Sequence, residues 1–296
     1  MSYLLDPSTR AIDLPSISGS TRICAVIGDP IEHTLSPAIH NAAFKLLKMD
    51  LAYVPFRVPT GELRGAIEGL RSLGVLGFNV MMPHKSSVLR FLDRIDETAE
   101  EIGAVNTVVR KQTLLHGYNT DGEGAERALS QLGSLVGRRA LILGAGGAAK
   151  AIAYYLSKSA ETIVILNRTS SNGARLASKI TRWSGIPSSS RALTRKNLGM
   201  EARGADLLIN TLPVHAFAQT SKIVMQDGLI AQDMLVMDVN YAPESEFIAE
   251  AKLAGAKAID GFEMLIQQAG LSFKLWTGRE APIDAMRRAA LEARSL

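Results

Sequence analysis

The chain has 296 residues, of which 47% are hydrophobic and 21% are charged, with a formal net charge of +4. This composition is too apolar for a disordered chain, and at roughly 100–200 residues per domain the length predicts two globular domains. Lysine and arginine are scattered, so the positive excess either has no function or favours a small anionic ligand, and nucleic acid is not an expected partner.

The first half alternates between strand-like and helix-like segments, after a lead-in of twenty residues rich in Ser, Pro and Asp that predicts a loose arm. Helices are predicted over 36–47, where Pro37 lies in the first turn, and over 62–73, which Gly74 closes. The expected strands cover residues 23–27, 52–58, 76–80, 105–110 and 114–118.

The first predicted strand holds the single cysteine, Cys24. One thiol in an apolar run predicts a buried core residue and a reducing compartment. No apolar stretch reaches the roughly 18 residues of a membrane span, and no signal segment precedes the strand, so we expect a cytoplasmic protein without a membrane partner. No histidine has metal-ligand spacing with an acidic or sulfur ligand, so no metal is expected.

A second alternating series begins near Arg139, and the predicted helix after Asp121 marks the border between the halves. Residues 187–190 are predicted to form a polar loop. Strands separated by helices indicate mostly parallel sheets covered on both faces. The predicted elements are a helix over 146–157 and strands over 140–143, 162–166, 207–210 and 235–239.

A glycine-rich turn joins the strand over 140–143 to the helix that follows it. The first glycine permits a tight turn, the second lets a pyrophosphate approach the backbone, and the small Ala149 allows the helix to pack on the strand. The alternative is a packing turn without a ligand. We predict that a dinucleotide contacts Gly144, Ala145, Gly146, Gly147 and Ala148.

The next strand ends in Asn167, Arg168 and Thr169. A site for NAD usually presents an acidic residue here, which bonds the ribose 2′-hydroxyl. A guanidinium instead pairs with a 2′-phosphate. The sequence therefore predicts NADP, with a solvated surface arginine as the alternative.

Polar clusters follow several strands of the first half, and the carboxyl ends of strands are where ligands bind in open α/β sheets. The clusters predict a site for one polyhydroxylated ligand. Ser36 has a second possible role, as the cap of the helix that follows it. The clusters are His33-Thr34-Leu35-Ser36-Pro37, Asn79-Val80-Met81-Met82-Pro83-His84-Lys85, Asn106-Thr107 and Asn119-Thr120-Asp121-Gly122.

Lys85 and Asp121 are the ionisable pair best suited to chemistry in these clusters. Carbonyl reduction needs a hydride from a nicotinamide and a proton for the oxygen, and a desolvated lysine exchanges such a proton. A nearby carboxylate orients the lysine and the substrate hydroxyl. Taken alone, Lys85 also fits a solvated lysine at a helix start, and the adjacent His84 fits a structural role.

Together these motifs resemble the shikimate dehydrogenase family over nearly the whole chain after the arm. Their common order along the chain is more specific than any one of them. The matching segments are residues 27–30, 33–41, 77–80, 83–85, 103–107, 117–122, the glycine turn, residues 167–169, and Met264, Leu265, Gln268, Phe273 and 276–278.

The resemblance implies two α/β domains, an open, mostly parallel substrate domain and a Rossmann-type NADP-binding domain, with the catalytic cleft between them. The implied substrate domain comprises residues 1–122 and 262–296, and the implied cofactor domain residues 123–261. The implied activity is the reversible NADPH-dependent reduction of 3-dehydroshikimate to shikimate, a step toward chorismate and the aromatic amino acids. Family members are monomers or homodimers that act on this small-molecule substrate.

The resemblance also assigns roles by position. Lys85 and Asp121 match the catalytic pair. The positions that match substrate contacts are Thr34, Ser36, Met81, Asn106, Tyr241 and Gln268. Besides the glycine turn, the implied cofactor contacts are Asn167, Arg168, Thr169, Asn210, Thr211 and Gly261.

The sequence departs from the family pattern at four places. Thr34 replaces a serine, and Met81 replaces a threonine that contacts substrate. Asn210-Thr211-Leu212 replaces Asn-Ala-Thr, and the segment around Tyr241 lacks a downstream threonine. The first two changes keep a quinate or quinate/shikimate dehydrogenase as an alternative. A further alternative is a catalytically silent ligand-binding regulator, which the retained Lys85 and Asp121 disfavour. Another is a reductase of folate-like compounds, which the polar loops of the first half disfavour.

Overall fold

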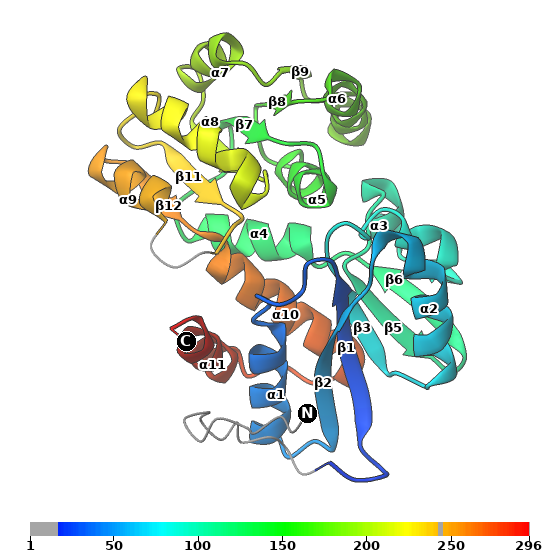
Figure 1. The fold of residues 1–296 in the computed structure, drawn as a ribbon. Coiled ribbons are helices and arrows are strands. Elements are labelled where there is room, and N and C mark those ends of the chain that lie inside the picture. Colours follow the sequence, from blue (N-terminus) through cyan, green and yellow to red (C-terminus); the bar gives the residue numbers. More distant parts are fainter. Residues whose placement is uncertain (1–16, 242–244, 296) are drawn as a thin grey trace, which may run out of the picture.

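The structure is a computed structural model that describes residues 17–241 and 245–295. Within these ranges the chain forms two α/β lobes, each around one six-stranded sheet (Figure 1). The predicted fold class is confirmed. The predicted N-terminal arm lies largely outside the described residues.

The first sheet has the strand order β2-β1-β3-β5-β6-β4. Its first three strands are parallel, and β5 then runs antiparallel to both β3 and β6. The strands are β1 (Arg22–Gly28), β2 (Leu51–Arg57), β3 (Gly77–Val80), β4 (Arg94–Ile95), β5 (Thr107–Lys111) and β6 (Leu114–Tyr118). The helices of this part are α1 (Ser36–Leu46), η1 (Thr60–Glu62), α2 (Leu63–Ser72), η2 (Val88–Phe91) and α3 (Glu97–Ile102).

The second sheet is parallel throughout, with the order β12-β11-β10-β7-β8-β9. This is the doubly wound order of dinucleotide-binding folds, whose crevice opens where the order reverses, between β7 and β10. Its strands are β7 (Arg139–Leu143), β8 (Thr162–Asn167), β9 (Ser188–Ala192), β10 (Leu207–Asn210), β11 (Leu235–Asp238) and β12 (Lys257–Ile259). Its helices are α5 (Gly147–Leu156), α6 (Ser170–Ser184), α7 (Arg195–Ala202), α8 (Val214–Gln226) and α9 (Glu246–Leu253).

Helices α4 (Asp121–Ser130) and α10 (Gly261–Thr277) join the two lobes (Figure 1). Helix α4 packs against both α10 and α5, and α11 (Ile283–Arg294) packs on α1. Glycines make this packing possible, because a Cβ on Gly122 would lie 2.4 Å from the Tyr155 ring and one on Gly124 2.9 Å from Gln268. The C-terminal segment thus returns to the first lobe.

Residues 187–190 were predicted as a loop, and this prediction is wrong. Ser188–Ala192 is strand β9, which pairs in parallel with β8 at the edge of the sheet. The Ser188 hydroxyl is 2.7 Å from the Thr181 hydroxyl and donates to the Ala177 carbonyl at 2.6 Å, so helix α6 satisfies it. A polar sequence forms a strand here because its backbone pairs with β8 at the edge of the sheet, where its side chains are only partly buried.

The cores of the two lobes are apolar, and Cys24 lies fully buried in the first. Burial raises the pKa of its thiol to about 12, so the group stays protonated and unreactive. Among the described residues, no helix is both long and apolar enough to cross a membrane.

Candidate active site

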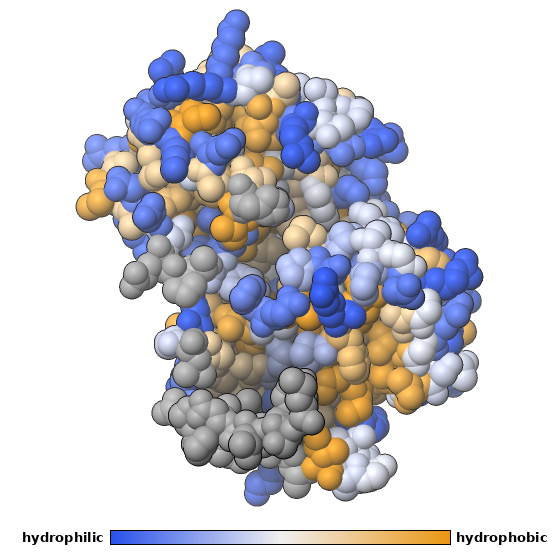
Figure 2. Space-filling view, viewed as in Figure 1, coloured by the Kyte–Doolittle hydropathy of each residue, from blue (hydrophilic) through white to orange (hydrophobic). Residues whose placement is uncertain are grey.

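A cavity of about 1200 Å³ opens between the lobes, where the space-filling surface narrows to a waist (Figure 2). The first lobe contributes the loop after β3, from Met81 to Ser86. The second contributes the glycine turn, the end of β8 and the start of α8. The cavity therefore lies at the carboxyl ends of strands from both sheets, where the sequence predicted a ligand.

The glycine turn has the geometry that a dinucleotide needs. Gly144 has a φ of +109°, and a Cβ there would lie 2.4 Å from the Thr211 hydroxyl. A Cβ on Gly146 would meet nothing within 4 Å, so the backbone is open at this point. Helix α5 begins at Gly147 without a side-chain cap. Its first N–H groups and the helix dipole are thus available to an anion.

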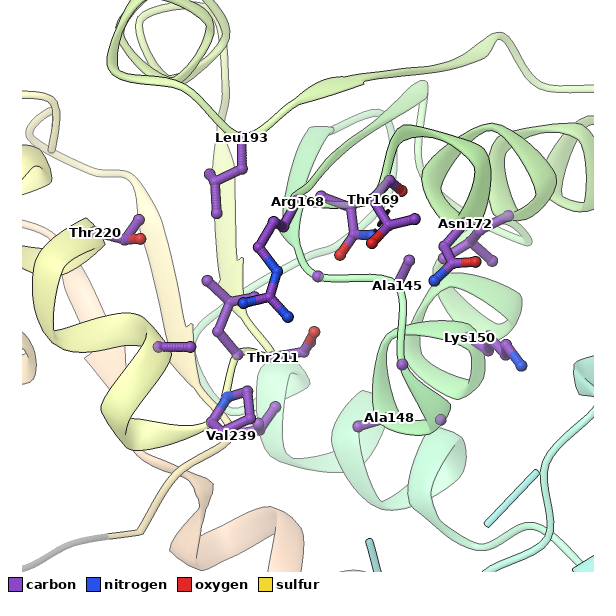
Figure 3. A pocket seen from close by; sticks show the side chains of 18 of the residues that line it. Ala145, Ala148, Lys150, Arg168, Thr169, Asn172, Leu193, Thr211, Thr220 and Val239 are labelled. Carbon is purple, nitrogen blue, oxygen red and sulfur yellow. Dashed lines mark hydrogen bonds between the residues drawn. The ribbon is translucent and has the colours of Figure 1, made fainter. Parts of the chain in front are cut away.

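The end of β8 presents Asn167, Arg168 and Thr169 to the cavity. The Asn167 amide donates to the Thr169 carbonyl at 2.9 Å, which fixes the turn. Figure 3 shows Arg168 reaching from this turn toward the centre of the pocket, near Thr211. No aspartate or glutamate is among the described residues that line the cavity, so nothing acidic there opposes a 2′-phosphate.

Lys85 and Asp121 meet at the other end of the cavity. The Lys85 ammonium donates to Asp121 Oδ2 at 2.6 Å, and the two side chains are 21% and 5% exposed. A Cβ on Gly147 would lie 3.2 Å from the Lys85 Cβ, so the pair adjoins the glycine turn. The predicted meeting of these distant residues is confirmed, while their catalytic roles stay a prediction.

A buried hydrogen-bond network lies behind the pair. Asn106 donates to Asp121 Oδ1 at 2.9 Å and to the side-chain oxygen Oε1 of Gln268 at 3.2 Å, which joins helix α10 to the site. The Ser272 hydroxyl, also on α10, lies 2.8 Å from that of Thr107. Sequence reasoning missed Ser272, because a helical serine usually has no long-range partner. The network continues through Thr120 and Asn79 to the Tyr53 hydroxyl, 2.6 Å from Asn79 Oδ1.

Comparison with known proteins agrees with this geometry. Residues 26–108 match the shikimate dehydrogenase substrate-binding domain, 126–239 the shikimate/quinate 5-dehydrogenase model and 261–291 the shikimate 5′-dehydrogenase C-terminal domain. The shikimate dehydrogenase (NADP(+)) of Thermococcus kodakarensis is 46% identical over 92% of this chain and 97% of its own. The chain belongs to the shikimate dehydrogenase family.

Solved structures of the family have the same fold. A shikimate dehydrogenase in complex with NADP+ superposes with a TM-score of 0.84 at 38% identity, over 94% of this chain and 97% of that one. The enzyme of Thermus thermophilus, in complex with NADP(H) and shikimate, gives a TM-score of 0.78 at 33% identity, over 92% and 99%.

Thr34 and Ser36 form a local pair in this shikimate dehydrogenase family member, away from the lining of the cavity. The Thr34 hydroxyl donates to that of Ser36 at 3.2 Å and accepts from the Ser36 N–H at 3.3 Å. The alternative role of Ser36 as a helix cap is wrong, because the cap position is Leu35 and no side chain caps the helix. Ser36 is nevertheless buried, so its hydroxyl is a fixed polar group.

Met81 and Tyr241 pack against the same apolar core of the first lobe, and Met81 also lines the cavity. Burial raises the pKa of the Tyr241 hydroxyl, which therefore stays protonated as a hydrogen-bond donor. Residues 242–244, downstream of this tyrosine, lie outside the described residues.

Two positions assigned to the cofactor lie beneath the cavity surface. Asn210 is fully buried and donates to Asp238 at 2.8 Å, and burial raises the pKa of that carboxyl. Gly261 does not line the cavity, and a Cβ there would lie 2.0 Å from the Val239 carbonyl oxygen. Close packing against Val239 therefore explains why residue 261 is a glycine. Thr211 does line the cavity, and its hydroxyl donates to the Leu143 carbonyl at 2.7 Å.

Four further cations line the cavity and were missed by the sequence reasoning: Lys150, Arg175, Lys179 and Arg195. Arg175 and Lys179 are four residues apart on α6, a spacing that puts both on one helix face and offered a signal. In the part of the chain that the structure describes, no three His, Cys, Asp or Glu side chains gather closely enough to hold a metal ion.

Proposed function

We propose that this protein catalyses the reversible NADPH-dependent reduction of 3-dehydroshikimate to shikimate, on the route to chorismate and the aromatic amino acids. The observation that carries the proposal is the Lys85–Asp121 pair, 2.6 Å apart beside the glycine turn of a family member. A catalytically silent regulator would not need an ion pair of this kind beside a solvent-accessible cavity.

The residues present fit NADP as the cofactor. The open backbone at Gly146 and the uncapped start of α5 suit a pyrophosphate. Arg168 suits a 2′-phosphate, and Asn167 and Thr169 shape the turn that presents it. Thr211 closes the base of the turn, while Asn210 and Gly261 support the cavity wall from behind.

When bound, NADPH supplies the hydride to the carbonyl carbon. Lys85 holds the carbonyl oxygen through its ammonium and delivers the proton that completes the alcohol. Asp121 accepts from Lys85 with one oxygen and from Asn106 with the other, so it keeps the ammonium in place. Because Asp121 is 5% exposed, little water competes for these bonds.

The ring hydroxyls of the substrate meet polar groups from both ends of the chain. Asn106 and Gln268 lie next to the pair. We assign the hydroxyls of Thr34, Ser36 and Tyr241 to further substrate contacts, although none of these three residues lines the cavity itself. Met81 offers only a thioether to the same space. We assign residues 1–122 and 262–296 to the substrate domain and 123–261 to the cofactor domain. The enzyme acts in the cytoplasm as a monomer or homodimer.

One assay tests the proposal. The purified protein is mixed with shikimate or quinate, each with NADP or NAD, and reduced cofactor is followed by absorbance. Shikimate with NADP is expected to give the largest kcat/KM. The absence of turnover with this combination would overturn the proposal, and a preference for quinate would move the assignment to the quinate branch of the family.

A further inference from the structure

A buried tyrosine in the first lobe belongs to the hydrogen-bond network behind the Lys85–Asp121 pair. Tyr53 lies on β2 and is 2% exposed, and its ring stacks on the imidazole of His40. Its hydroxyl lies 2.6 Å from Asn79 Oδ1. Burial raises the pKa of this phenol well above its ordinary value, so the hydroxyl keeps its proton and is available as a donor.

The direction of the Tyr53 hydrogen bond follows from the groups around Asn79. The side-chain nitrogen of Asn79 lies 3.1 Å from the main-chain carbonyl oxygen of Asn106, which can only accept. The Asn79 amide therefore faces Asn106 with its nitrogen and Tyr53 with its oxygen. Because an amide oxygen cannot donate, the Tyr53 hydroxyl donates to it.

The same reasoning extends this bond into a hydrogen-bond relay that ends at the carboxylate. Asn106 Oδ1 accepts from the main-chain N–H of Thr120 at 2.8 Å, so the Asn106 nitrogen points the other way and donates to Asp121 Oδ1 at 2.9 Å. Between the two asparagines, Asn79 donates to the Thr107 hydroxyl and this hydroxyl donates to Asn106 Oδ1, each at 3.1 Å. Every link of the relay therefore donates toward the carboxylate.

From these contacts we propose that Tyr53, the first donor of the relay, is a positioning residue for Asp121. Its hydroxyl sets the orientation of the Asn79 amide, and the later links carry that orientation to Asp121 Oδ1. The second carboxylate oxygen, Oδ2, is thereby left for the Lys85 ammonium. Buried hydrogen bonds that run in one direction polarise one another, so loss of the first donor weakens the last bond. The proposal rests on the catalytic role proposed above for Lys85 and Asp121.

Steady-state kinetics of the full chain with shikimate and NADP test this role. Tyr53→Phe removes only the hydroxyl and is expected to lower kcat by about tenfold, the scale of one hydrogen bond. KM for NADP should stay unchanged, because the relay does not reach the glycine turn. Tyr118→Phe is the matched control, since the Tyr118 hydroxyl bonds to the exposed Lys111 on the same sheet, and its kcat should equal that of the parent.

A double-mutant cycle separates positioning from a general loss of packing. In an Asn106→Ala background the last link is already absent, so adding Tyr53→Phe should lower kcat no further. Multiplication of the two losses, or a Tyr53→Phe variant with the parent kcat, would overturn the proposal. If Tyr53→Phe does not fold at the assay temperature, Thr107→Val and Thr107→Ser replace it. Only Thr107→Val, which lacks the hydroxyl, should then lose turnover, and a Thr107→Val variant with the parent kcat would overturn the relay.

A measurement without substrate keeps this proposal distinct from the proposed reaction. The NMR signal of the Asn106 side-chain amide reports on its bond to Asp121, and it should move in Tyr53→Phe but not in Tyr118→Phe. A moved signal in a protein that does not turn over shikimate would refute the proposed reaction and support the relay. An unmoved signal in an active enzyme would overturn the relay alone.

Discussion

The polar side chains at the two ends of the cavity differ in whether other side chains of the protein satisfy them. At the Lys85–Asp121 end, side chains from α4, α10 and the strands of the first sheet satisfy one another in a buried network. At the cofactor end, Arg175 and its neighbours have only neutral partners and face open space. From this difference we expect that the first end is organised before substrate binds, and that an anionic ligand completes the second wall.

The largest effect should come from the preformed end. Lys85→Ala is expected to reduce kcat by about 10²–10⁴-fold, the range for loss of a general acid, because water is a poor replacement for the ammonium. Shikimate binding should persist, since Asn106 and Gln268 remain. Stopped-flow turnover with calorimetric binding checks this, with exposed Lys252→Ala as control. Surviving turnover would return Lys85 to a surface role.

The first lobe also contains a buried histidine, His40, whose ring nitrogens are both unsatisfied. Its ring stacks on Tyr53 at 4.5 Å and neither nitrogen has a hydrogen-bond partner among the described residues. Burial lowers its pKa from 6.5 to about 3. Between pH 6.5 and about pH 3 the unfolded chain therefore binds a proton at this histidine that the folded chain does not. The free energy of unfolding is unaffected by this histidine above pH 6.5 and decreases as the pH falls toward 3.

His40→Phe should therefore flatten the acid dependence of stability. At about pH 5 the linkage amounts to about 2 kcal/mol relative to neutral pH. Urea unfolding at several pH values measures the slope, and exposed His33→Phe is the control. Parallel pH profiles for the parent and His40→Phe would show that this histidine does not contribute.

At the cofactor end, Arg168→Ala should raise KM for NADPH by about tenfold, because a charge-assisted bond to the 2′-phosphate is lost. KM for NADH should change little. Steady-state kinetics with both cofactors make the comparison, and Arg182→Ala should leave both values unchanged. An equal rise in KM for NADH would show that Arg168 does not select NADPH over NADH.

The smallest effect is expected for a substitution in the buried hydrogen-bond network, at its α10 residue Ser272. Ser272→Ala should lower the free energy of unfolding by about 1 kcal/mol, because Thr107 and Asn79 each lose one bond but keep another. A small decrease in kcat should accompany it. Thermal unfolding measures the change against Ser130→Ala, an exposed serine. A neutral result would indicate that the network does not depend on this hydroxyl.

Local patterns predicted most of the elements. The first strand, the helix beginning at Ser36 and the glycine turn were located to within a residue or two, because burial period and turn chemistry are read along the chain. Strand β9 was missed because its serines carry no apolar pattern. Ser36 was given a capping alternative because hydroxyl residues often cap helices, whereas its hydroxyl accepts from Thr34 instead.

The sequence by itself determined the chemical groups available: a glycine turn with Arg168 behind it, and Lys85 and Asp121 in loops after strands. Only the tertiary structure decided which of them meet. Helix α10 brings Gln268 and Ser272 across more than a hundred residues to Asn106 and Thr107, and α6 folds Arg175 onto Asn172 at the cavity wall. Such contacts depend on the packing of whole elements, and local sequence patterns specify the elements but not their neighbours.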